Sequence, residues 1–189
     1  MTAALSIVRA FAPDLVDLDP LLAAEMVGWS DGTWYQRAAW DAIVRGWYCP
    51  ITSRDGSSLY LLRLWLTEPR ITDGEERLDS TRSRLLHYFR RPDDDDSLHD
   101  HPWAFTTTIV AGGYTEHLPP LTWTPGSALG PAWNARHIDR DAGATVVHAA
   151  GDLHCVGSIL ANTWTIVRTG PKERPWGFHP PGQPWQYYR

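Results

Sequence analysis

Two histidines separated by a single residue stand in the part of the sequence that could do chemistry. His99 and His101 lie in the segment LHDHPWAF, which runs into the threonines and branched residues typical of a β-strand. Residues two apart on a strand project to the same face, so both imidazoles can approach one metal ion. Two ligands do not make a metal site, and a third must come from another segment.

His154 is the candidate for the third ligand. It lies in the segment HAAGDLHCV, where Gly151 supplies a turn directly before a strand. Asp100 alternates away from its two histidine neighbours, and we do not count it as a ligand. The sequence therefore predicts a metal centre formed by His99, His101 and His154.

The spacing of these histidines resembles the first half of the signature of the cupin superfamily. That half reads His-x-His, three or four residues, Glu, six residues and Gly. His99 and His101 fill the pair, and Gly112 stands at the glycine position. Phe105 stands at the Glu position, with Thr106 as the one-residue alternative. The usual carboxylate ligand is therefore missing from its expected place.

The second half of the signature reads Gly, five residues, Pro-x-Gly, two residues, His, three residues and Asn. Gly143, Gly151 and His154 meet it, while Ala149 stands in place of Pro and Ser158 in place of Asn. Three further segments look like small bacterial and phage cupin-like proteins, namely LLHYFRRPDDDDSLHDHPW, GGYTEH and TWTIVRTGPKERPWGFHPP. The resemblance implies an all-β fold, the cupin-type double-stranded β-helix or jelly-roll barrel, and pairing into a homodimer.

The missing glutamate has a chemical consequence. Three neutral imidazoles leave a divalent ion with its full charge and with open coordination positions, which suits Fe(II) with O2 and an anionic substrate. Zn, Ni, Co, Mn and Cu stay open as alternatives, because imidazole accepts many metals. The thiol dioxygenases of the cupin group also lack the carboxylate, and the similarity to them lies in the ligand set only.

Three side chains are candidates for proton transfer at this centre. Glu116 and Tyr114 share a face in the segment GGYTEH, and either could bind the ion or act as acid or base. An outward Glu and a packing Tyr are the alternative. His87 could be a fourth ligand or a proton relay, or a core histidine bonded to a backbone carbonyl.

Arg63, Arg168 and Trp176 are candidates for substrate binding. Arg63 lies inside the apolar run LYLLRLWL, where a guanidinium needs a partner, either a substrate carboxylate or phosphate or an acidic side chain. Arg168 shares a face with Trp164 and Ile166 and could point into the mouth of the barrel. Trp176 lies in a segment rich in Pro and Gly that could fold over one barrel end as a lid or an apolar plug.

The hydrophobic periodicity predicts which elements position these residues. Residues 14 to 47 have helical spacing and predict two short helices, with Asp19 before Pro20 as an N-cap. After Pro50 the pattern changes to period two, which predicts strands at 59–67, 84–90, 104–117, 145–159 and 163–170. We expect one structural domain, made of an N-terminal helical extension (1–50) and a cupin β-barrel (51–189).

Composition narrows the function classes. The 17 Lys and Arg are scattered among 22 Asp and Glu, and a net charge of −5 without a basic cluster argues against nucleic acid. No run approaches the roughly 20 apolar residues of a membrane span, and the N-terminus lacks the positive segment of a signal peptide. Cys49 and Cys155 lie far apart, so we predict a cytoplasmic protein without disulfides.

These observations lead to one functional hypothesis and two alternatives. The first is an Fe(II) oxygenase or dioxygenase that oxidises a small polar or anionic molecule with O2. The second is a metal-dependent isomerase, epimerase or lyase, with Glu116, Tyr114 or His87 moving protons. The third is a non-catalytic cupin that binds a small ligand, because a fold does not decide function.

Overall fold

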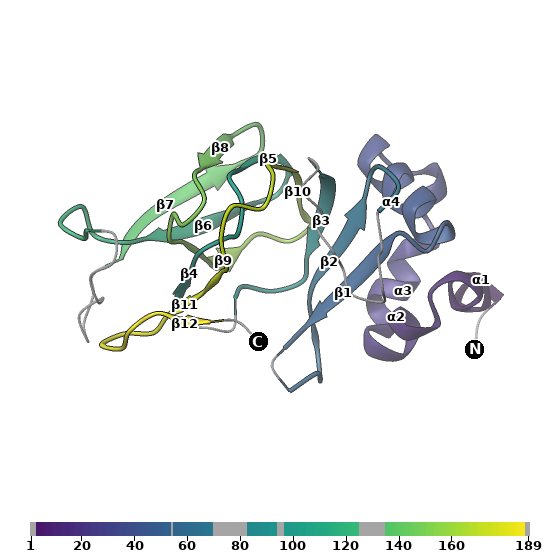
Figure 1. Cartoon of the computed structure of the whole chain (residues 1–189). Helices are drawn as coiled ribbons and strands as arrows, with labels where there is room; N and C mark the ends of the chain where they lie inside the picture. The colour runs from purple at the N-terminus through teal and green to yellow at the C-terminus, as the bar shows by residue number, and fades with distance from the viewer. Residues whose placement is uncertain (1–2, 54, 70–82, 94–96, 125–134, 188–189) are drawn as a thin grey trace.

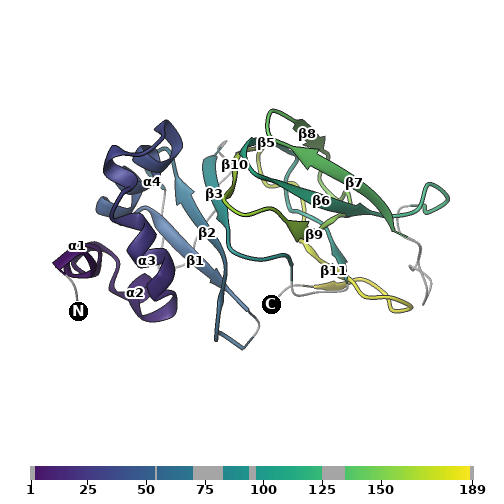
Figure 2. The same ribbon diagram turned by 180° about the vertical axis from the view of Figure 1, so that it is seen from behind.

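The computed structural model describes residues 3–53, 55–69, 83–93, 97–124 and 135–187. Figure 1 shows the N-terminal helices at one end, next to one part of a large sheet, and the smaller sheets at the other end, beside the rest of the large sheet. The reverse view in Figure 2 shows the same arrangement. The helices cover the part of the large sheet that carries β1 (Tyr48–Thr52), β2 (Leu59–Trp65) and β3 (Arg84–Phe89). None of the described helices is both long and apolar enough to cross a membrane.

The helical extension contains more elements than the two helices predicted. The described residues form α1 (Ala3–Phe11), α2 (Pro13–Leu18), α3 (Pro20–Met26), the 3₁₀ turn η1 (Trp29–Asp31) and α4 (Trp34–Val44). The predicted cap is present, because the Asp19 side chain accepts a hydrogen bond from the Leu22 amide at 2.9 Å. The extra breaks follow from Pro13 and Pro20, which begin helices because proline fits the first turn and interrupts later ones.

The predicted strands are present, and they pair in antiparallel sheets. The large sheet has the order β1 (Tyr48–Thr52), β2 (Leu59–Trp65), β3 (Arg84–Phe89), β10 (Thr163–Thr169), β5 (Phe105–Ala111) and β8 (Thr145–His148). One small sheet contains β12 (Gln186–Tyr187), β11 (Gly177–His179) and β4 (Leu98–His99). The other contains β7 (Arg136–Asp141), β6 (Gly113–Leu118) and β9 (Cys155–Ile159).

The pairing corrects the expectation of a closed barrel. Among the described residues, the strands pair into these three separate sheets, whose hydrogen bonds do not join into one closed cylinder. Two predicted strands are also each divided in two, because Gly112 and Gly151 adopt positive φ angles of 66° and 88° that end the extended backbone. The mostly β, antiparallel fold class with helices in front is confirmed.

The face of the large sheet that meets the helices carries the largest core. Trp164 on β10 is 2% exposed, and its ring stacks on Tyr88 at a centroid distance of 4.4 Å. Trp29 from the helical layer meets the Trp164 ring edge-on at 5.0 Å. Strand alternation therefore turns these aromatic rings toward the helices and leaves the opposite face for the interior between the sheets.

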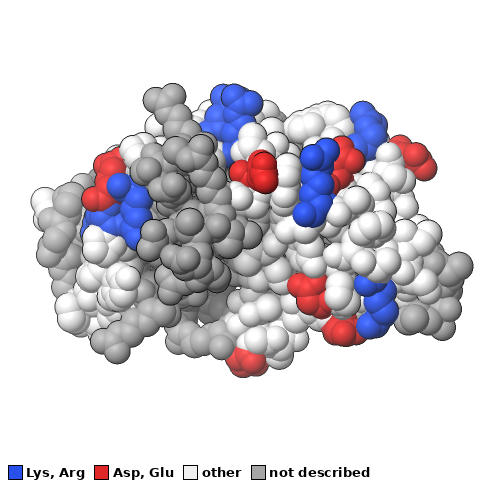
Figure 3. Space-filling model, turned by 45° about the vertical axis from the view of Figure 1, so that its right-hand side comes forward, with Lys and Arg blue, Asp and Glu red and all other residues white. Residues whose placement is uncertain are grey.

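Charged side chains are mixed on the molecular surface. The face in Figure 3 carries Lys and Arg next to Asp and Glu, and on this face the described residues show no patch of a single sign. A mixed surface agrees with the net charge of −5 and gives no electrostatic guidance for a polyanion on this side.

The glycine between β5 and β6, which belong to different sheets, leads to a specific prediction about stability. A Cβ at Gly112 would lie 2.7 Å from the Cα of Thr163 and 2.9 Å from its nitrogen, in addition to the strain of the positive φ. We expect Gly112→Ala to lower the free energy of unfolding by about 2–3 kcal/mol, measured by urea denaturation. Gly143→Ala is the control, since its φ is 93° but nothing lies within 4 Å. Equal losses in both variants would contradict the steric argument.

Candidate metal centre

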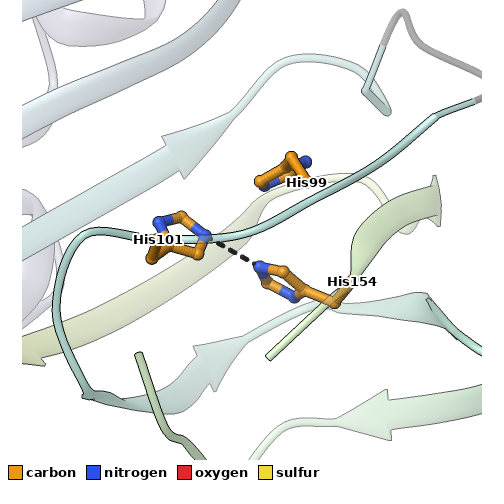
Figure 4. A group of neighbouring side chains, drawn as sticks. All are labelled: His99, His101 and His154. Carbon is orange, nitrogen blue, oxygen red and sulfur yellow. Dashed lines mark hydrogen bonds between the residues drawn. The ribbon is translucent and has the colours of Figure 1, made fainter. Parts of the chain in front are cut away.

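The three predicted histidines meet in the interior between the sheets. His99 ends β4, His101 follows two residues later, and His154 comes directly before β9. The backbones of His99 and His154 exchange two hydrogen bonds, of 2.9 and 3.0 Å, and this bridge brings the two segments together. The ligand atoms of the three side chains lie within 4.8 Å of one another, and Figure 4 shows the rings converging.

The geometry of the group fits a divalent metal ion. The Nε2 atoms of His101 and His154 are 2.9 Å apart, and Figure 4 marks this contact. Two nitrogens bound at about 2.0–2.1 Å to one ion, at a right angle, are separated by about 2.9 Å. Burial lowers the pKa of His99 to about 4 and lowers the pKa of His101 well below its usual value, so both rings are neutral near pH 7. Neutral imidazoles are the form that binds metals.

One strand was expected to carry both His99 and His101, but the backbone differs from this expectation. β4 ends at His99, and His101 lies in the following loop. Asp100, between them, is 1% exposed and points to the other side, where it accepts hydrogen bonds from the Gly177 amide at 2.7 Å and from Trp185 Nε1 at 3.1 Å. This clamp holds the loop, so both imidazoles still face the same point without a continuous strand.

Glu116 lies beside the three histidines and is fully buried. Its Oε1 is 2.9 Å from His154 Nδ1 and 2.9 Å from His148 Nε2, while its Oε2 accepts from Arg140 Nε at 2.9 Å. Burial alone would raise the pKa of Glu116, but the contacts with His148 and His154 outweigh it and hold the pKa well below its usual value. Glu116 is therefore an anion. It contacts the predicted ligand His154 at Nδ1, the ring nitrogen that does not face His101.

His148 is a residue of this region that sequence reasoning missed. It follows Val146 by two positions on β8, and both side chains are buried, so alternation with Val146 was the available signal. Its ring stacks on that of Phe105, with a centroid distance of 4.7 Å. Phe105 is the residue at the Glu position of the sequence signature. Glu116, His148 and His154 form a second group whose ligand atoms lie within 4.8 Å of one another.

Tyr114 and His87 are buried but do not belong to the three-histidine group. Tyr114 packs in an apolar cluster against Phe89, and burial, together with the charge of Glu116, raises the pKa of its hydroxyl. His87 is 9% exposed, and its Nε2 accepts a hydrogen bond of 3.4 Å from Arg63 Nε. Burial and the Arg63 charge lower the pKa of His87 well below its usual value, so this ring is neutral. Neither residue is in a metal-ligating group of the described residues.

Of the three predicted substrate-binding residues, Arg63 and Trp176 are half-buried and Arg168 is exposed. Arg63 is half-buried on β2, and its charge reaches the interior, since it contributes to the lowered pKa of His101. The Trp176 ring lies parallel to the His101 ring, at 5° and a centroid distance of 6.4 Å. The prediction that Arg168 points into the interior is wrong, because it is exposed and shares the face of Trp164 and Ile166, which pack toward the helices.

The lowered pKa of His99 predicts how stability depends on pH in metal-free protein. Between about pH 6.5 and pH 4 the unfolded chain binds a proton at this ring that the folded chain does not, so stability falls as pH decreases. The loss from His99 alone is about 3 kcal/mol, measured by urea unfolding with a chelator present. The His99→Asn variant should show a shallower decrease, and an unchanged slope would contradict the assignment.

Comparisons with known proteins add a statement about fold. The sequence matches no protein-family model and no curated protein. A DMSP lyase structure shares 17% identity over 65% of this chain and 55% of the lyase chain, so about half of that chain is spanned, with a TM-score of 0.42. An RmlC-like cupin from Desulfovibrio desulfuricans shares 12% over 59% of this chain and 83% of its own, with a TM-score of 0.36. Fe(II)-HppE shares 10% over 88% and 94%, with a TM-score of 0.43.

Its structural neighbours are cupin proteins. The mostly β, antiparallel arrangement is of the fold class expected from the His-x-His signature, but its sheets stay separate. Phe105, which stands at the Glu position of the sequence signature, stacks on His148. The buried carboxylate that contacts His154 belongs to Glu116 on β6, 11 residues after Phe105.

Proposed function

We propose that this chain is a metal-dependent enzyme, in which His99, His101 and His154 bind Fe(II) for the oxidation of a small polar or anionic molecule by O2. The observation that supports it is the convergence of three imidazoles, with the Nε2 atoms of His101 and His154 2.9 Å apart. Bound Fe(II) would supply Lewis acidity and redox chemistry at this point. No carboxylate is among the three ligands, so the ion would keep its full charge for an anionic substrate.

The chain's own residues would bind and orient the substrate. Arg63, His87 and Thr165 are direct neighbours across β2, β3 and β10. This polar row lies between two apolar groups, one that includes Leu61 and Phe89 and another that includes Trp65 and Leu85. The Thr165 hydroxyl is buried without a hydrogen-bond partner, and the guanidinium of Arg63 carries the charge that an anion needs.

Trp176 would shield the reacting groups from water. Its indole is half-buried and lies parallel to the ring of His101, as a cover over one ligand would. Excluding water strengthens electrostatic interactions inside the site and suppresses side reactions. The lid role expected for Trp176 is retained here as part of the proposal.

The experiment that tests the proposal measures oxygen uptake. Protein loaded with Fe(II) under anaerobic conditions is mixed with a panel of small carboxylates, phosphate esters and neutral polar molecules, and O2 consumption is recorded. We expect uptake with an anionic member, its loss in His101→Ala, and a 10- to 100-fold lower kcat/KM in Arg63→Met, about the value of a charge-assisted hydrogen bond. Metal-loaded protein that converts a substrate without consuming oxygen would overturn the oxygenase proposal.

That last outcome would favour the alternative of a metal-dependent isomerase, epimerase or lyase. Such an enzyme needs a side chain that exchanges protons with the substrate. His87 fits this role best, because it is neutral and lies beside Arg63, whereas Glu116 is already held by Arg140 and His154. A His87→Gln variant that keeps its metal but loses turnover would support this alternative.

We further propose that the protein acts in the cytoplasm and forms a homodimer. Cys49 and Cys155 are not joined in a disulfide, which is compatible with a reducing compartment. β1 and β8 are the edges of the large sheet and could pair with a second copy. Light scattering of the purified protein would measure the mass directly.

A further inference from the structure

The buried carboxylate of Glu116 contacts the centre through the side of His154 that faces away from the other ligands. His154 has its Nε2 2.9 Å from His101 Nε2 and its Nδ1 2.9 Å from Glu116 Oε1. A neutral imidazole carries one N–H, and a carboxylate with no proton can only accept. His154 Nδ1 must therefore carry a proton to donate to Glu116 Oε1, and in a singly protonated ring this leaves the lone pair on Nε2, the nitrogen on the side of His99 and His101.

Arg140 binds the second oxygen of the Glu116 carboxylate. Its Nε donates to Glu116 Oε2 at 2.9 Å, and its Nη2 lies 2.7 Å from the same oxygen. The Arg140 side chain is 22% exposed, while Glu116 is 0% exposed, so the pair links the interior to the edge strand β7. The guanidinium neutralises the carboxylate, and its two contacts hold Oε2 away from the three histidines.

His148 completes the surroundings of the carboxylate. Its Nε2 is 2.9 Å from Glu116 Oε1 but lacks the angle of a hydrogen bond, whereas the contact of His154 Nδ1 with the same oxygen has it. Glu116, His148 and His154 could themselves surround an ion. Such an ion would have to displace the proton on His154 Nδ1 and would lie close to the positive charge of Arg140.

We propose that Glu116 is a positioning residue for the metal centre, which fixes the tautomer and orientation of His154 so that Nε2 is the ligand atom, while Arg140 keeps the carboxylate out of the coordination sphere. The inference rests on the three-histidine centre of the proposed function, and not on the reaction with O2. Carboxylates that hold a metal-binding histidine in this way typically raise metal affinity 10- to 100-fold.

The test measures metal affinity with no substrate. Co(II) is titrated into the full-length chain in competition with a chromophoric chelator, and the Co(II) absorption spectrum is recorded. In Glu116→Gln we expect a Kd 10- to 100-fold higher and a shifted Co(II) band, still with one ion per chain, because the amide is uncharged and can present N–H to Nδ1. In Arg140→Gln we expect a Kd equal to that of the wild type or a few-fold lower, since a donor stays and a positive charge near the ion is removed.

The different effects of the two variants on the Kd for Co(II) distinguish a positioning role of Glu116 from a purely structural one. If the network only stabilised the fold, both variants would lose stability and neither would change the Kd of the folded protein. Asp19→Asn is the matched control, because it breaks a partly buried ion pair with Arg90 at 2.8 Å outside this region and should lower stability without changing the Kd. An unchanged Kd in Glu116→Gln overturns the proposal. If that variant does not fold, a Kd more than 5-fold higher in Arg140→Gln overturns it.

Two further variants distinguish this failure from that of the proposed metal centre. His148→Ala should keep one ion per chain, since His148 is not a ligand in this arrangement. If His148→Ala and Glu116→Gln abolish binding while His99→Ala retains it, the ion binds at the other group, and both the positioning role and the three-histidine centre are wrong. If His99→Ala abolishes binding while Glu116→Gln binds normally, only the positioning role is wrong.

Discussion

His101→Ala is expected to lower the affinity for a divalent transition metal by more than about 100-fold, because losing an outer partner of a ligand already costs about 10- to 100-fold. The other two imidazoles would remain, but two ligands from one side cannot hold an ion against water. The measurement is metal content per folded chain after dialysis, together with a chelator competition. In the wild type, excess metal at 100 times the Kd should add about 2.7 kcal/mol of stability, and this increment should vanish in His101→Ala.

The control for this prediction is a histidine outside the site. His137 is exposed on β7, where its ring stacks on His117 at 4.2 Å. His137→Ala should bind metal as the wild type does and show the same thermal stabilisation. Equal metal content in His101→Ala, His99→Ala and the wild type would mean that the converging rings are only a polar plug in the interior.

Trp164→Ala is expected to have the largest effect on stability, a loss of about 3–5 kcal/mol in the free energy of unfolding. The indole is 2% exposed, stacks on Tyr88 and meets Trp29 edge-on, so its removal leaves a cavity where the helices join the large sheet. Urea unfolding followed by tryptophan fluorescence and far-ultraviolet circular dichroism would measure the loss. A loss of that size exceeds a third of the stability of many domains.

A second tryptophan provides the comparison. Trp34 begins α4 and is 51% exposed, so Trp34→Ala should cost less than about 1 kcal/mol. If the two variants unfold at the same urea concentration, the helices do not share a core with the sheet. If Trp164→Ala shows two separate transitions, the helices and the sheets are independently folding units.

The grouping of the three histidines could be predicted because it depends on the spacing of residues that are close in the sequence. His99 and His101 are two positions apart, and Gly151 indicates a turn shortly before His154. Rules of residue spacing and turn formation were therefore sufficient. The cap at Asp19 was predictable for the same reason, since an N-cap involves contacts only three residues away. These features depend on neighbours along the chain and not on the final packing.

The direction of Arg168 could not be predicted in this way. Alternation correctly groups Arg168 with Trp164 and Ile166, but it does not say which face of a strand is inside. Large apolar side chains suit a face covered by helices as well as a barrel interior, and here the helices cover it. The contacts of Glu116 were equally hidden, because Arg140 and His148 are 24 and 32 residues away in the sequence.

The hydrogen bonds to Asp100 affect when the centre can be completed during synthesis. The Gly177 amide and Trp185 indole that hold this loop follow Asp100 by 77 and 85 residues. Closing loops of that length is entropically costly, and chains rich in such distant contacts fold slowly. A nascent chain emerging from the ribosome therefore cannot fix His99 and His101 before residues 177–185 have been made. Ion uptake and the last step of folding should then be a single late event.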